Sequence, residues 1–273
     1  MNLTPDNYYS QEANKEYWSV SQIKSFLDCP VKALAEMEGT YQRPSSTALL
    51  VGGFVDAYFA GEMEEFQEKN PQIFTRKGDL RYDYQHAQKI IDRIERDRLC
   101  VDMLDGEKQH IVTGNIAGFP VKAKLDVLLS EKKANAIGMI YPEMSELLFA
   151  PGAIVDLKIM RDFNDQYREG EGRLNWIEFW MYDLQMAVYQ ELMRQKTGKR
   201  YPCYILAATK EEIPDITLYQ IPQGLMDASL EILIDRMPSL NAVKKRIEAP
   251  EPCGKCPVCK ERKVLSGATW FEE

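Results

Sequence analysis

The sequence predicts an α/β fold in which a mixed central β-sheet is flanked by helices. Three observations carry this prediction: a helical N-terminal third, a meander of three strand-like segments, and a long helical segment followed by two further strands. Helices and strands that alternate in this order are typical of an α/β architecture. The chain shows no internal repeat and no low-complexity segment.

The N-terminal third has helix start signals. Ser19 and Ser21 are suitable N-caps for a helix that runs to about Met37. Pro30 lies inside that segment, where it either kinks the helix or starts a second one. Two further helices and the loop between them are expected at residues 47–59, 84–99 and 70–83.

The middle of the chain predicts strands, because apolar and polar residues alternate there. Gly118 lies in a hairpin turn at 115–120. The segment 130–152 contains two prolines and is long for a simple loop, so we expect a local excursion with structure of its own. The three strands are expected at 110–116, 120–129 and 153–160.

The C-terminal part begins with what we predict to be the longest helix, at 173–196, ended by Gly198. Two strands are expected at 201–208 and 216–221, and Pro222 opens a final helix at 223–247. The buried stripe of the long helix is formed by residues at three-to-four spacing: Ile177, Met181, Leu184, Val188 and Leu192.

A chain of 273 residues suits one large domain. We expect a single domain over 1–273, with an N-terminal helical part at 18–100, a sheet and helix at 107–221, and a C-terminal helix with a cysteine-rich tail at 222–273. The N-terminus lacks an apolar signal core, and no stretch approaches the ~18 apolar residues of a membrane span. A cytoplasmic protein without a membrane partner is expected.

The charge balance excludes one class of nucleic-acid protein. A net charge of −8 argues against a generally basic coat protein, although local basic patches still decide phosphate contacts. The tail is locally basic at 244–246 and 255–263. It is either a solvated helix end with a charged loop or a surface that faces DNA.

Polar residues interrupt two of the predicted strands. Asp126 ends one apolar-alternating run, and Asp156 and Lys158 lie in the next one. Residues two apart on a strand project to the same face. A buried carboxylate is costly unless it is paired or bound to metal, so Asp156 either forms a salt bridge or binds a cation. Two carboxylates and an amine on adjacent strands could bind a hard divalent cation beside a water molecule, which suits phosphodiester hydrolysis.

The long helix adds Gln185 and Tyr189, which fall four apart on one helical face. In the order Asp126, Asp156-x-Lys158, Gln185-x-x-x-Tyr189, the chain resembles the PD-(D/E)XK nucleases. More narrowly, it is similar to the RecB-type branch that includes RecE-like phage and prophage exonucleases. The opening segment, 18–30, is similar to the start of the same branch.

The resemblance implies a restriction-endonuclease-like core and a role for each motif residue. Asp126 and Asp156, joined by the backbone carbonyl of Leu157, would bind Mg²⁺ or Mn²⁺. Lys158 would orient or help deprotonate the attacking water and steady the charge that develops on the phosphate. The two helix residues would help to place catalytic groups or the DNA backbone, although by themselves they also fit an ordinary helix surface.

The chain departs from the resembling nucleases at one position. Many of them have a histidine after a Gly-rich turn, where this chain has Asp56. Asp56 is therefore either a third carboxylate ligand for Mg²⁺ or a solvent-facing helix residue. Lys124 shares a strand face with Asp126, and we expect it to contact a substrate phosphate. His86 and His110 lie outside the motifs and are expected to have no catalytic duty.

The six cysteines fall into two groups. Cys100 and Cys203 are isolated and are expected to be buried, inert thiols. The tail carries a C-x-x-C-x-x-C run, Cys253, Cys256 and Cys259, whose spacing favours metal over disulfides in a reducing cytoplasm. Three cysteines need a fourth ligand to complete a metal site.

Cys29 is the natural candidate for that fourth ligand. The layout resembles RecB-type nucleases in which one cysteine before the core and three after it hold a 4Fe–4S cluster that ties the two ends of the chain together. The spacing from Cys256 to Cys259 is shorter than theirs. A 4Fe–4S cluster, zinc, and free thiols or an adventitious disulfide all stay open.

The function implied by the resemblance is a metal-dependent exonuclease that acts on linear double-stranded DNA, from 5′ to 3′, in phage or prophage recombination. A homo-oligomer and a single-strand annealing protein as partner are implied in the same way. The alternatives are a single-strand exonuclease of the CRISPR-associated RecB-like type and a non-catalytic DNA-binding or scaffold protein. A redox or regulatory module centred on the cysteines is a further interpretation.

Overall fold

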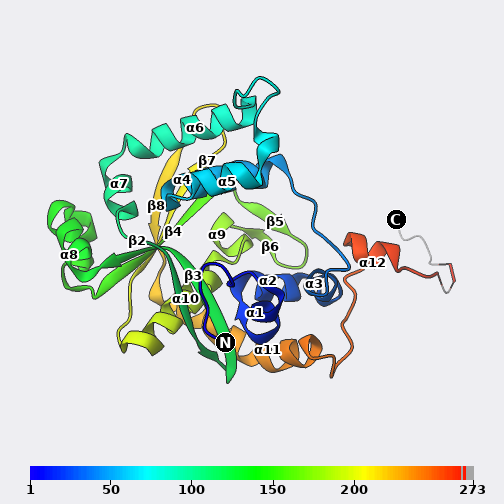
Figure 1. Ribbon diagram of the computed structural model, residues 1–273. Coiled ribbons are helices and arrows are strands. Elements are labelled where there is room, and N and C mark those ends of the chain that lie inside the picture. The colour runs from blue at the N-terminus through cyan, green and yellow to red at the C-terminus, as the bar shows by residue number, and fades with distance from the viewer. Residues whose placement is uncertain (266, 269–273) are drawn as a thin grey trace. The chain divides into compact units, whose positions relative to one another are not determined.

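A computed structural model describes residues 1–265, 267 and 268 (Figure 1). The chain forms two compact units. Unit 1 comprises Met1–Pro44, Ile116–Val121 and the described residues from Ile234 onward. Unit 2 comprises Ser45–Asn115 and Lys122–Leu233.

The centre of unit 2 is a mixed sheet, as the sequence predicts. Its strands follow the order β3, β4, β7, β8, and β2 pairs with β3. The β4–β7 pair is parallel, whereas β3–β4 and β7–β8 are antiparallel. A separate antiparallel ribbon is formed by β5 and β6. The strands span Glu107–Ile116 (β2), Phe119–Ser130 (β3), Gly152–Met160 (β4), Gln166–Arg168 (β5), Gly172–Leu174 (β6), Cys203–Thr209 (β7) and Ile216–Gln220 (β8).

The predicted hairpin joins β2 to β3. Its turn residues, Ala117 and Gly118, both have left-handed backbone angles, with φ of 50° and 82°. Two consecutive left-handed residues match the right-handed twist of the flanking strands, which is why a glycine is favoured at this turn. The turn therefore sets the register that leads into β3.

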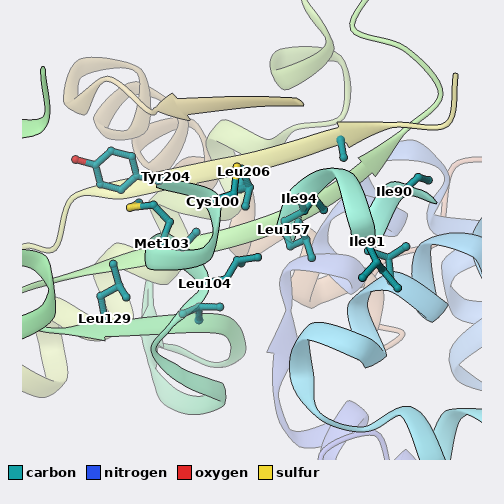
Figure 2. Close-up of a cluster of buried hydrophobic side chains, with 14 of the residues drawn as sticks. Ile90, Ile91, Ile94, Cys100, Met103, Leu104, Leu129, Leu157, Tyr204 and Leu206 are labelled. Carbon is teal, nitrogen blue, oxygen red and sulfur yellow. The ribbon is translucent and has the colours of Figure 1, made fainter. Parts of the chain in front are cut away.

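One face of the sheet in unit 2 is covered by helices that precede it in the chain. Figure 2 shows Ile90, Ile91 and Ile94 of α6 and Met103 of α7 packed toward apolar side chains of the strands. α4 and α6 lie side by side. The helices and 3-10 turns of unit 2 span Thr47–Ala60 (α4), Met63–Lys69 (α5), Pro71–Ile73 (η1), Tyr82–Glu95 (α6), Arg98–Leu104 (α7), Glu131–Ile140 (α8), Pro142–Phe149 (η2), Trp176–Phe179 (α9) and Tyr182–Thr197 (α10).

Two predicted helices are interrupted. The helix expected at 84–99 ends as α6 at Glu95, because Asp97 accepts a hydrogen bond from the backbone N–H of Cys100 (3.1 Å) and so caps α7. The helix expected at 173–196 is also divided, because Met181 has a left-handed backbone angle (φ 52°) between α9 and α10. Among the described helices, α11 is the longest, with 22 residues against 16 for α10.

The excursion between β3 and β4 has structure of its own, as expected. It consists of α8 and η2, which pack against each other. Ile137 of α8 and Leu147 of η2 are buried in the same apolar cluster as β3 and β4. The excursion is therefore part of the core of unit 2.

Unit 1 contains segments from both ends of the chain. Ser19 caps α2 by accepting a hydrogen bond from the N–H of Gln22 (3.3 Å), and Pro30 begins a second helix, α3. Lys244, near the C-terminal end of α11, lies 4.2 Å from the ring of Trp18 and is buried. The elements are Gln11–Glu16 (α1), Trp18–Ser19 (β1), Val20–Asp28 (α2), Pro30–Met37 (α3) and Pro257–Glu261 (α12), together with the end of α11, Gln223–Lys244.

Two basic residues of the tail form contacts within unit 1. Lys244 donates to the carbonyl of Tyr17 (2.9 Å), and Arg246 forms an ion pair with Glu38. Lys244 is buried and is therefore neither solvated nor available to DNA, whereas Arg246 forms its ion pair at an exposed position. Among the described helices, none has the length and apolar character needed to span a membrane.

Candidate active site

Asp126 and Asp156 are brought together by the pairing of β3 with β4. The antiparallel register places Val127 opposite Val155. Asp126 directly precedes Val127 and Asp156 directly follows Val155, so the two aspartates lie at the neighbouring position of the two strands. The backbone N–H of Leu157 donates to Oδ2 of Asp126 (3.0 Å). The excursion formed by α8 and η2 leaves this pairing intact, because it leaves and rejoins the sheet at the far ends of both strands.

Lys158 joins the two aspartates electrostatically. Its Nζ forms an ion pair with Oδ2 of Asp156 and lies 3.9 Å from Oδ2 of Asp126. It also donates to the carbonyl of Leu157 (3.3 Å). Since the Asp156 side chain has no exposed surface, these contacts take the place of the water that would surround an exposed carboxylate.

The helix α10 supplies the second partner of Asp156. Gln185 donates its side-chain N–H to Oδ1 of Asp156 (2.7 Å) and to the hydroxyl of Tyr189 (3.2 Å). Gln185 and Tyr189 share one face of the helix, as their spacing predicts. Gln185 therefore contacts the acidic centre directly, and Tyr189 contacts it through Gln185.

Asp56 lies on α4, which is capped by Ser46. Asp56 lines one recess of unit 2 together with Asp126 and Leu157. The structure thus brings the third predicted carboxylate into the same recess as the strand residues.

Comparison with known families decides the classification. The chain matches the model of a family described as a PDDEXK-like domain of unknown function (DUF3799) over residues 19–136 and 144–262. The chain belongs to this family. The predicted nuclease fold class, a restriction-endonuclease-like core with a mixed sheet, is thereby confirmed.

A solved structure from Eubacterium rectale is similar to this chain over nearly its whole length. It is described as a "putative exonuclease", is 37% identical in sequence, and superposes with a TM-score of 0.86. The match covers 99% of this chain and 97% of that chain. Among curated proteins, none matches the sequence.

In this PDDEXK-like chain, mutual repulsion and loss of solvation change the protonation of the carboxylates. Burial and the negative charge of Asp156 raise the pKa of Asp126 to about 8, and desolvation within the recess raises the pKa of Asp56 to about 7, with Asp156 adding to it. Burial by itself lowers the pKa of Lys158, but Asp156 and Asp126 outweigh burial and raise it, so the amine stays an ammonium group.

These residues fit a divalent metal ion. Oδ2 of Asp156 is buried and, in the described part of the chain, accepts no well-directed hydrogen bond besides its ion pair with Lys158. Asp126, Asp56 and Leu157 line one recess, and Asp126 and Asp156 share the ammonium group of Lys158. An all-oxygen donor set with excess negative charge suits Mg²⁺ or Mn²⁺.

Two further residues at the site carry no signal in the sequence. The ring of Tyr182 lies 5.3 Å from Nζ of Lys158, because Tyr182 opens α10 directly after the left-handed Met181. Gln109 lines the recess and has a left-handed backbone angle (φ 52°), which is uncommon for a residue with a side chain. Both positions depend on backbone breaks that local patterns do not predict.

The remaining predicted residues lie outside this centre. Lys124 lies two residues before Asp126 on β3 and is half-buried. His86 contacts the carbonyl of Lys210 (3.1 Å), and His110 pairs with Glu107 (2.6 Å). The two histidines thus have structural contacts away from the carboxylates.

The four predicted cysteine ligands gather in unit 1. Cys29 precedes α3, and the other three lie at or before α12, which packs beside α3. The four sulfur atoms lie within 4.8 Å of one another, an arrangement compatible with metal binding. Cys100 and Cys203, by contrast, are buried and separate.

The raised carboxyl pKa values predict how stability depends on pH. A carboxyl group whose pKa rises on folding holds more protons in the folded than in the unfolded state between about pH 4 and pH 8. The metal-free protein is therefore expected to lose unfolding free energy as the pH rises through this range. Urea unfolding in EDTA at pH 5 and pH 8 measures this slope, and Asp126→Asn is expected to reduce it.

Asp235→Asn, at an exposed position on α11, is the matched control and should keep the wild-type slope. Mg²⁺ added at pH 8 should restore stability to the wild type and not to Asp126→Asn, since the metal binds the deprotonated carboxylates. Equal slopes for the wild type and Asp126→Asn would contradict the charge coupling at this site.

Proposed function

We propose that this protein is a Mg²⁺-dependent deoxyribonuclease, an exonuclease that hydrolyses phosphodiester bonds of linear double-stranded DNA. The observation that carries the proposal is the contact set of Asp126, Asp156 and Lys158 on two paired strands. The family assignment and the described exonuclease from Eubacterium rectale support a nuclease. Mn²⁺ would serve in place of Mg²⁺, since both prefer oxygen ligands.

The chemistry assigns a separate part to each group. A bound divalent ion would polarise the scissile phosphate and lower the pKa of a nearby water molecule. Asp126, Asp156 and the carbonyl of Leu157 would hold the ion, with Asp56 as a third carboxylate. In the hydrolysis, the water oxygen adds to phosphorus, the bond to one sugar oxygen breaks, and that oxygen leaves with a proton while the water releases one to solvent.

Lys158 would interact with the phosphate through its positive charge. Lys158 would orient or help deprotonate the attacking water, and as an ammonium group it can donate a hydrogen bond to the phosphate oxygen on which negative charge develops. Gln185 holds Asp156 in place, and Tyr189 holds Gln185. The two helix residues thus act as positioning residues.

The finer assignments follow from the resemblance to RecE-like enzymes. They are 5′-to-3′ polarity, a role in phage or prophage recombination, a homo-oligomeric state and a single-strand annealing protein as partner. A single-strand exonuclease of the CRISPR-associated type is the alternative within the class. A purely DNA-binding scaffold is disfavoured, because a binder gains nothing from a buried aspartate near DNA phosphates.

Degradation of end-labelled linear DNA tests the proposed activity. With Mg²⁺ the wild type should release label from duplex DNA, and EDTA should stop the release. Lys158→Ala should lower the rate by roughly 10²-fold or more, because it removes a donor aimed at the developing charge. Labels at the 5′ and 3′ ends, on duplex and on single strands, give polarity and substrate.

The matched control is Lys132→Ala, which removes a lysine from the exposed side of α8 and should keep the wild-type rate. Thermal unfolding of each variant separates loss of chemistry from loss of fold. Absence of cleavage of any labelled DNA by folded wild-type protein in Mg²⁺ or Mn²⁺ would reject the enzyme proposal and favour the scaffold.

Lys124 is proposed to bind a substrate phosphate, since it lies two residues before Asp126 on the same strand face. Lys124→Ala should weaken DNA binding and reduce the slope of log K against log salt by about 1. Fluorescence anisotropy with labelled duplex in Ca²⁺ measures both. Lys89→Ala, at an exposed position on α6, is the control, and an unchanged slope for Lys124→Ala would refute the contact.

Exposed apolar side chains on the excursion support the proposed homo-oligomer. Met139, Ile140 and Phe149 are 74%, 61% and 93% exposed, which is unusual for large apolar residues grouped on one short segment. Sedimentation equilibrium should give a multiple of 31.5 kDa for the wild type and a smaller mass for Phe149→Ser. A monomeric wild type would contradict this assignment.

A further inference from the structure

The sulfur atoms of the four-cysteine site are too close together for the cluster that the resemblance implies. Sγ of Cys29 lies 3.6 Å from that of Cys259 and 3.7 Å from that of Cys256, and Sγ of Cys253 lies 3.9 Å from that of Cys259. All four ligand atoms lie within 4.8 Å of one another. The distances therefore describe a small tetrahedron.

These distances match a site with a single metal ion. Four sulfurs at a Zn–S distance of about 2.3 Å form a tetrahedron with edges of about 3.8 Å. A 4Fe–4S cluster instead places a different iron behind each thiolate, so that its four cysteine sulfurs surround a whole cube and lie much further apart. A disulfide is also excluded, since its two sulfurs lie about 2.05 Å apart.

We propose that Cys29, Cys253, Cys256 and Cys259 bind one Zn²⁺ ion in tetrahedral coordination. Zinc accepts a four-thiolate set without preference for another geometry, and four protein ligands leave no open position for a substrate. The ion is therefore structural. This proposal is independent of the proposed nuclease activity, because it concerns residues of unit 1 only.

The backbone around the tail cysteines is arranged to support thiolates. The N–H of Cys256 donates to the sulfur of Cys253 (3.3 Å), and the N–H of Cys259 donates to the sulfur of Cys256 (3.4 Å). The left-handed Gly254 (φ 70°) allows the tight turn that directs these groups toward the sulfurs. Such N–H donors offset the excess negative charge of four thiolates around one Zn²⁺ ion.

Cys29 reaches the site through the start of α3. Its sulfur makes no capping hydrogen bond to that helix, and Pro30 at the first helical position has no N–H that needs one. The sulfur of Cys29 is therefore directed to the other cysteines. Apolar side chains of Val31, Ala35 and Val258 pack around the sulfurs and shield them from water.

The consequence is a metal bridge between segments more than 220 residues apart in the chain. Beside the ion pair of Arg246 with Glu38, it would fix α12 to α3 inside unit 1. Because structural zinc binds only the folded arrangement, its binding free energy would stabilise this unit.

Metal analysis of the intact wild-type protein tests the proposal. The protein is produced with both iron and zinc supplied and purified without oxygen, and zinc, iron and acid-labile sulfide are measured per chain. One zinc, with neither iron nor sulfide, is expected. X-ray absorption at the zinc edge should show four sulfur neighbours at about 2.3 Å.

Variants assign the ion to these residues. Cys253→Ser should lose the zinc or hold it at least tenfold more weakly in competition with a chelator, whereas Cys100→Ser, which alters a cysteine outside the site, should keep one zinc per chain. Co²⁺ in place of zinc should give the intense visible absorption of tetrahedral thiolate coordination. These readouts do not depend on nuclease activity.

Three results would overturn the assignment. Four irons with four sulfides would mean the cluster, and one iron without sulfide would mean a single-iron centre. Wild-type protein with four reactive thiols and no bound metal would exclude a metal site altogether. All three are measured on the wild type, so a variant that fails to fold does not change the conclusion.

Discussion

The ion pair between Asp156 and Lys158 is the interaction on which the rest of the catalytic centre depends. Asp156 is fully buried in a central strand, where an ionised carboxylate is unstable without partners. Lys158 supplies the opposite charge from the same strand face, and Gln185 supplies an N–H from a helix. These two groups hold the carboxylate in place.

The sheet explains why the partners come from those two places. In the parallel pair β4–β7, Asp156 lies beside Ile205, which offers no polar group. Val155 and Leu157 point into the apolar cluster on the opposite face, under α4, α6 and α7. The printed partners of Asp156 accordingly come from its own strand, as Lys158, and from α10, the helix between β4 and β7, as Gln185.

The two inferred metal sites differ in their ligand atoms and in whether a coordination position is left open. The carboxylate centre is an oxygen site that is open on one side, where Asp126 and Asp56 line a recess, as expected of a site that must admit a substrate phosphate. The cysteine centre is a closed sulfur site. One would supply chemistry in unit 2, and the other would supply stability in unit 1.

Much of the candidate site is predictable from the sequence because its residues lie on regular elements. Alternation on a strand puts Asp156 and Lys158 on one face, and a four-residue step on a helix does the same for Gln185 and Tyr189.

The breaks at Asp97 and Met181 are harder to predict. Asp97 is also compatible with a helix interior, and a methionine rarely adopts the left-handed backbone angle of Met181. The positions of Tyr182 and Gln109 follow from such breaks, so they could not be predicted.

The spacing C-x-x-C-x-x-C predicts a metal site but not the identity of the metal, because the distances between the sulfur atoms depend on where α3 places Cys29.

Asp126 and Asp156 are proposed to form a metal centre beside Lys158. Anomalous diffraction from crystals soaked in Mn²⁺ tests it most directly. A manganese peak within ~2.0–2.4 Å of carboxylate oxygens of both aspartates and of the Leu157 carbonyl is the predicted result. Crystals that contain Mn²⁺ elsewhere, or none, with the Asp156–Lys158 ion pair unchanged, would contradict the account.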